Sequence, residues 1–135
     1  MHRSILTITT ILILALLAAC GGAPAVTTAQ VGEKLTTAGA TNIHDEQLGA
    51  DVPVPKSFTS HQVFEIASVA PKGGQFFVCD TKQNCDAIYA YYDALKALAG
   101  PYLYRNQSGT VVAQLNAGLK PDEAAQFQKA LEALP

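Results

Sequence analysis

Two cysteines, Cys79 and Cys85, are the residues whose type and spacing most clearly suggest chemistry. Cys79 ends a predicted strand, and Cys85 lies near the start of the helix predicted to follow, on its apolar side. Both side chains should therefore face the junction between strand and helix. If the chain is exported to an oxidising compartment, an even pair of this kind favours a disulfide. We expect this bond to fasten the helix to the sheet.

Thiol–disulfide exchange is the alternative use of the same pair. A cysteine near a helix N-terminus has its thiolate stabilised by the helix dipole. Here the spacing is C-x5-C rather than C-x-x-C, and the negative charges of Asp80 and Asp86 would disfavour a thiolate. A structural disulfide is therefore the leading interpretation, and a redox protein using Cys79 and Cys85 is the alternative.

Other catalytic and metal-binding patterns are missing from the sequence. It contains no G-x-S-x-G, P-loop, H-E-x-x-H or D-x-D-x-D-G motif. His44 and His61 are isolated, and no second cysteine pair completes a zinc site. We expect no cofactor, no metal and no enzymatic activity.

The N-terminal residues have the pattern of an exported precursor. Met1-His2-Arg3 carries a firm positive charge, and residues 4–19 are uncharged and rich in isoleucine and leucine. A membrane-spanning helix needs about 20 apolar residues, and this segment is shorter and interrupted by threonines. Such a segment is typical of a cleaved signal peptide. It ends with Leu17-Ala18-Ala19-Cys20.

These four residues resemble the lipobox of bacterial lipoprotein precursors. The resemblance implies that residues 1–19 are removed and that the Cys20 thiol receives a diacylglyceryl group. The new N-terminus would then be acylated, and the chain would be held on the extracytoplasmic side of a bacterial membrane. Two or three acyl chains anchor firmly, because each buried CH₂ contributes ~0.8 kcal/mol.

Charge limits the other partners. The formal net charge is −2, and lysine and arginine form no run. A nucleic-acid-binding surface would need a basic patch, so none is expected. The membrane is the expected partner, through the covalent lipid.

Hydrophobic spacing predicts one α+β domain over residues 28–135, preceded by an acylated tether over residues 20–27. The expected elements are a helix at 28–38, a loop or edge strand at 40–57, strands within 58–69 and 75–79, a helix from Asp80 to Ala99, a hairpin of strands 102–105 and 110–115, and a helix from Pro121. The order is α-β-β-α-β-β-α, with an antiparallel sheet of about four strands in two or three layers.

The predicted strands are apolar on both faces. The first face is predicted to lie under the two long helices and carries Phe77, Cys79, Val111, Ala113 and Leu115. The second face is predicted to carry Phe76, Val78, Val112, Tyr102 and Tyr104. Either the N-terminal helix and the 40–57 segment cover this second face, or it is open to a protein or a small apolar ligand.

The mature part resembles small α+β lipoproteins of bacterial envelopes. The shared pattern is an L-x2-A-G helix end, here Leu35, Ala38 and Gly39, together with Tyr104, Gly109 and Val112 in the hairpin. This class has no assigned activity, so the resemblance implies a fold but no chemistry. The resulting expectation is a tethered, non-enzymatic binding or structural module.

Overall fold

Five antiparallel strands form one sheet in the order β1-β2-β3-β5-β4 in the computed structural model, which describes residues 25–135. The strands are β1 (Ala40–Asp45), β2 (Ser60–Ile66), β3 (Gly73–Val78), β4 (Leu103–Arg105) and β5 (Val111–Leu115). The helices are α1 (Thr28–Thr37), α2 (Lys82–Ala94), α3 (Lys96–Ala99) and α4 (Pro121–Glu132), with a 3₁₀ turn at Ala67–Val69. The predicted signal peptide, the lipobox with Cys20 and most of the tether lie outside the described residues.

The α+β class and the antiparallel sheet are confirmed. The predicted order α-β-β-α-β-β-α omits α3, whereas β1 corresponds to the edge-strand alternative predicted for residues 40–57. β1 forms from the start of the 40–57 segment and pairs with β2 as the edge of the sheet. Its side chains are mostly exposed and its pairing shifts between Thr41 and His44, so it has no strong hydrophobic alternation.

Capping and first-turn residues mark the start of each long helix. Thr27 and Gln30 form a capping box at α1, and Pro121 opens α4 with Asp122 and Glu123 in its first turn. The helix predicted to start at Asp80 has Thr81 as its N-cap in the structure, and the Thr81 hydroxyl accepts a hydrogen bond from the Asn84 amide.

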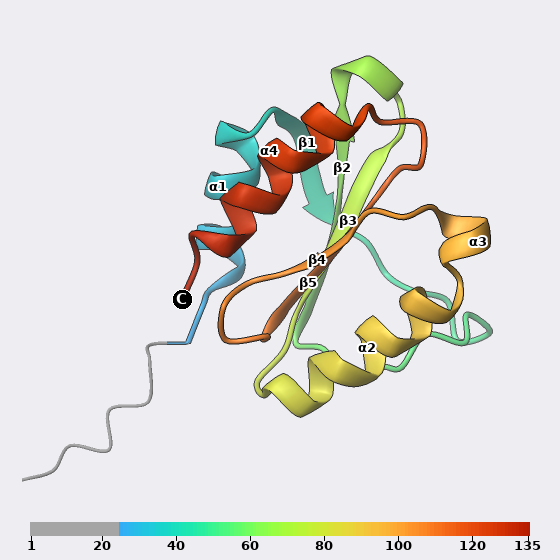
Figure 1. The fold of residues 1–135 in the computed structure, drawn as a ribbon. Coiled ribbons are helices and arrows are strands. Elements are labelled where there is room, and N and C mark those ends of the chain that lie inside the picture. Colours follow the sequence, from blue (N-terminus) through green and yellow to red (C-terminus); the bar gives the residue numbers. More distant parts are fainter. Residues whose placement is uncertain (1–24) are drawn as a thin grey trace, which may run out of the picture.

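The helices lie on opposite faces of the sheet (Figure 1). α1 and α4 cover one face and bury Leu35, Phe127 and Leu131 against it. α2 packs on the other face through Ile88, together with Val54 from the segment between β1 and β2. The protein therefore has three layers, with the sheet in the middle.

The predicted division of the sheet residues between the two faces is wrong. Phe76 pairs with Ala113 and Phe77 with Val112, so Phe76 shares a face with Ala113 and not, as predicted, with Val112. Phe76 and Val78 consequently lie under α1 and α4, whereas Val112 lies under α2. A shift of one residue moves a strand side chain to the other face.

Neither face is open at these positions. Phe76 and Val112 are fully buried, and Val78 is also buried. Tyr102 and Tyr104 are partly buried against the α1–α4 layer, where the Tyr102 hydroxyl donates a hydrogen bond to the Leu119 carbonyl. The expected binding face is therefore divided between two parts of the core.

Candidate functional site

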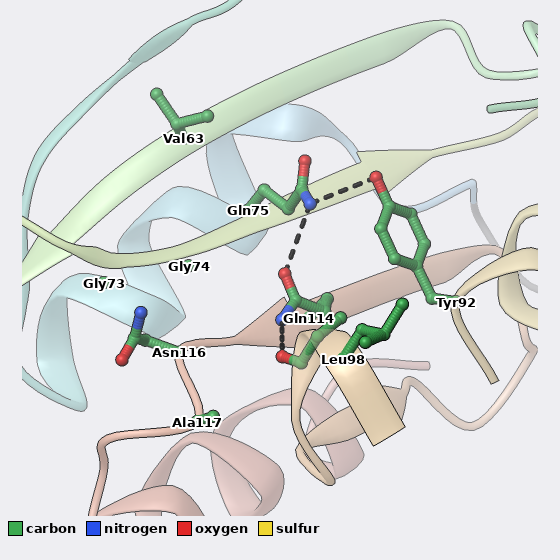
Figure 2. Close-up of a pocket in the computed structure, with 10 residues that line it drawn as sticks. Val63, Gly73, Gly74, Gln75, Tyr92, Leu98, Gln114, Asn116 and Ala117 are labelled. Carbon is green, nitrogen blue, oxygen red and sulfur yellow. Dashed lines mark hydrogen bonds between the residues drawn. The ribbon is translucent and has the colours of Figure 1, made fainter. Parts of the chain in front are cut away.

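A surface groove with a volume of about 540 Å³ lies between α3 and the middle of the sheet. β3 and β5 supply its floor through Gln75 and Gln114, and α3 supplies a wall through Leu98 and Ala99. In Figure 2, dashed lines join Gln75 to Tyr92 and to Gln114, and Tyr92 and Leu98 are drawn on the same side of the two glutamines. Cavities of this size accommodate small molecules.

Leu98 is on this wall because the predicted long helix breaks at Leu95. The Leu95 amide donates to the Tyr92 carbonyl, and the Leu95 backbone has φ −98° and ψ 7°. The chain then restarts as the short helix α3 in a new direction (Figure 1). Leu98 falls within the single helix predicted from Asp80 to Ala99, where its spacing from Ile88 and Leu95 favours the apolar side of that helix. Instead Leu98 is 86% exposed, and among residues 25–135 it is the one large hydrophobic residue classed as exposed to solvent.

An amide network forms the polar part of the floor. The Gln75 Nε2 group donates to the Tyr92 hydroxyl (3.1 Å) and to Gln114 Oε1 (3.2 Å). The Gln114 Nε2 group donates to the carbonyls of Ala99 (2.9 Å) and Leu115 (2.8 Å). Gln75 and Gln114 are direct partners in the β3–β5 register, so both amides lie at one level of the sheet.

Two hydrogen-bond donors beside this network have no acceptor among residues 25–135. Tyr92 accepts from Gln75, which leaves its own hydroxyl hydrogen to be donated. Burial raises the pKa of Tyr92, so its phenol keeps that hydrogen at neutral pH. Asn116 uses its Oδ1 to accept from the Gly118 amide (2.9 Å), and its Nδ2 group lines the groove without a partner.

The lining of the groove is uncharged and mixes polar with apolar groups. None of its lining side chains is charged, and none forms a nucleophile–base pair. It combines neutral donors with apolar surface from Val63, Leu98 and Ala117. Such a surface can bind an uncharged group that has oxygen acceptors and an apolar part.

The sequence reasoning missed these residues, although one signal was available. Gln75 and Gln114 interrupt apolar strands, and strand alternation places them on the same face as Phe77 and Val112. Two amides in an otherwise apolar layer need partners. That signal could have pointed to a polar site, but not to its second wall from α3.

The predicted cysteine pair is at disulfide distance. The Cys79 and Cys85 sulfurs are 2.12 Å apart, and their Cα atoms are 5.7 Å apart. Cys79 is 4% exposed and Cys85 is fully buried, in the layer that includes Ile88 and Val112. The pair thus connects the residue after β3 to the first turn of α2, away from the groove.

The histidines in the described part of the chain are His44 and His61. No group of three potential histidine, cysteine or carboxylate ligands occurs within residues 25–135. His44 is exposed on β1 and its ring forms a hydrogen bond with the Asn42 carbonyl, whereas His61 is buried in β2.

Among residues 25–135, no helix is long and apolar enough to cross a membrane.

Comparison of the chain with protein-family models, with curated proteins and with solved structures finds no match.

Proposed function

We propose that this protein is a membrane-tethered lipoprotein of the bacterial envelope whose domain is a non-enzymatic binding module. Its lipid is carried by Cys20, and its ligand site is the groove between α3 and the sheet. The observation that carries the ligand site is the exposed Leu98 side chain beside donors that lack acceptors. A concave surface that combines apolar side chains with a few neutral polar groups is typical of small-molecule sites.

The groove chemistry defines the ligand class. The Tyr92 hydroxyl and the Asn116 amide nitrogen would each donate to a carbonyl or hydroxyl oxygen of the ligand. Leu98 and Val63 would cover its apolar part. The lining has no charged group to compensate an ionic ligand, so we propose a small uncharged molecule.

A ligand screen by NMR tests the site. Uncharged fragments bearing carbonyl or hydroxyl groups should shift the amide resonances of Leu98, Gln114 and Asn116. The Leu98→Asp variant should weaken this binding at least tenfold. Gln126→Ala, an exposed change on α4, is the matched control and should bind like the unchanged protein. Shifts that cluster on the α1–α4 layer, or binding unaffected by Leu98→Asp, would contradict the site.

The anchor has a separate test. The intact mass of protein extracted from membranes should equal residues 20–135 plus a diacylglyceryl group and any N-terminal acyl group. The Cys20→Ser variant should lose both the added mass and the membrane association. A mass matching residues 20–135 without lipid would refute the anchor and leave only secretion.

The burial of the cysteine pair bears on the redox alternative. A thiol–disulfide exchange protein needs at least one sulfur that a partner can attack. Cys79 and Cys85 are both enclosed in the α2 layer, which supports a structural role.

A further inference from the structure

A series of hydrogen bonds begins at the buried His61 on β2 and continues over β3 and β5, on one face of the sheet, to the groove. His61 is 5% exposed, and its ring stacks on Phe77 with the centroids 4.5 Å apart. Its Nδ1 lies 2.8 Å from the Glu46 carbonyl oxygen, and its Nε2 lies 2.9 Å from Gln75 Oε1. Both ring nitrogens therefore face oxygen atoms.

The donor and acceptor directions of these hydrogen bonds are fixed at Gln114, the residue of the series farthest from His61. The Gln114 Nε2 group faces two backbone carbonyls, which can only accept, so Gln114 must turn its oxygen toward Gln75. Gln75 must then turn its nitrogen toward Gln114 and its oxygen toward His61. The Glu46 carbonyl at the other ring nitrogen also accepts only.

All of these contacts are satisfied together only when His61 carries a proton on both nitrogens. A neutral imidazole has one N–H and one bare nitrogen, so one of its two contacts would place a lone pair against an oxygen. The neutral network is therefore one donor short.

The groups around His61 are compatible with a cationic ring. On its β1 side, Asp45 and Glu46 line the same surface hollow as His61, and no lysine or arginine of the described residues lines it. From β3, Gln75 and Phe77 face the ring and neither titrates. From α2, the nearest titratable group in the chain of hydrogen bonds is Tyr92, which is neutral.

We propose that His61 is a pH-responsive switch that sets the orientation of the Gln75 amide in the floor of the groove. When His61 loses a proton, Nδ1 keeps its hydrogen because the Glu46 carbonyl cannot donate. The Gln75 side chain can rotate, and its Nε2 group then donates to the bare His61 Nε2. The rotated oxygen accepts from the Tyr92 hydroxyl, and the contact between Gln75 and Gln114 is lost.

This rearrangement changes what the groove offers. In the protonated state the Tyr92 hydroxyl hydrogen is free for a ligand, and in the neutral state Gln75 takes it. The consequence for binding rests on the proposed function, but the rearrangement itself does not. It can therefore be tested without a ligand.

The test is NMR of the full chain between pH 5 and pH 8.5. At low pH both His61 ring nitrogens should show attached protons, and at high pH Nε2 alone should lose its proton. The side-chain amide resonances of Gln75 and Gln114 should shift with the same midpoint. In His44→Gln, the matched control, these shifts should persist, because His44 is exposed and contacts neither glutamine.

Two variants should abolish the coupled shift. His61→Gln removes the titrating ring, and Gln75→Met keeps the ring but removes the rotating amide, so the Gln114 amide should no longer respond to pH. Glutamine resonances that stay constant in the unchanged chain while His61 titrates would overturn the proposal. A neutral His61 with its proton on Nε2 would also overturn it, because the Glu46 contact would then be the one released.

Discussion

Opening the Cys79–Cys85 pair should destabilise the domain by an amount that the short loop determines. The two cysteines are six residues apart. In the chain-entropy model, closing a loop of this length restricts the unfolded chain enough to contribute about 2 kcal/mol. For a domain of about this size, that difference corresponds to a fall in melting temperature of about 10 °C.

The assay is urea unfolding of one preparation in the oxidised state and after full reduction with a strong phosphine reductant. The expected result is a lower midpoint for the reduced protein, with a denaturant slope that is equal or slightly higher, because the unfolded chain without its short cross-link exposes a little more surface. The Cys79→Ala/Cys85→Ala variant is the matched control, and its midpoint should not respond to the reductant.

Thiol labelling separates the structural role from the redox one. Because the pair is buried, a mild reductant such as glutathione should leave it closed in the folded protein, with no labelling at either position. Equal stability of the oxidised and reduced forms would refute the reasoning about the loop. Rapid opening of the pair by glutathione in the folded protein would refute the structural role and favour the redox alternative.

Two further predictions concern the core and the surface charges. Val112→Asp should destabilise the domain by at least about 4 kcal/mol and unfold it, because the substitution buries an unpaired carboxylate. Leu98→Asp, in solvent, should change the stability by no more than about 0.5 kcal/mol. Circular dichroism melts would check both variants, and a folded Val112→Asp protein would show that this face is not part of the core. Lys82 and Arg105 hydrogen-bond to Asp86 and lower its pKa, so its carboxylate stabilises the folded state at neutral pH and this contribution is lost as pH falls through the lowered pKa. Asp86→Asn should therefore reduce the urea midpoint slightly at pH 7 and not below that pKa, and an equal loss at both pH values would contradict the ion pairing.

The cysteine pair could be predicted because the relevant information is local. Cys79 and Cys85 are close in sequence, at the end of one element and the start of the next, so almost any packing of the helix on the sheet brings them together. The start of α4 was equally accessible, because Pro121 and the two acidic residues after it act within one turn.

The faces of the sheet could not be assigned in the same way. β3 and β5 are apolar on both sides, so their hydrophobic pattern has no period that sets the register. A pairing shifted by one residue would match the sequence pattern equally well. In the structure Val112 pairs with Phe77, so it does not share a face with Phe76. This difference in register alone divides the predicted binding face between the two sides of the sheet.

The groove depended on still longer-range information. Gln75, Tyr92, Leu98 and Gln114 come from four elements, and they meet only because the chain turns at Leu95 and β3 pairs with β5. Helical spacing continued through Leu95 to Ala99, so the pattern favoured a core position for Leu98.

By itself the sequence determined the class of the fold, the paired cysteines and the expectation that Cys20 carries a lipid, since each depends on neighbouring residues or on periodicity. Tertiary structure alone decided which strand residues share a face, which helices cover them and where a groove remains. The physical reason is that register and layer packing are set by contacts between distant segments, and a chain with two apolar sheet faces permits more than one local solution.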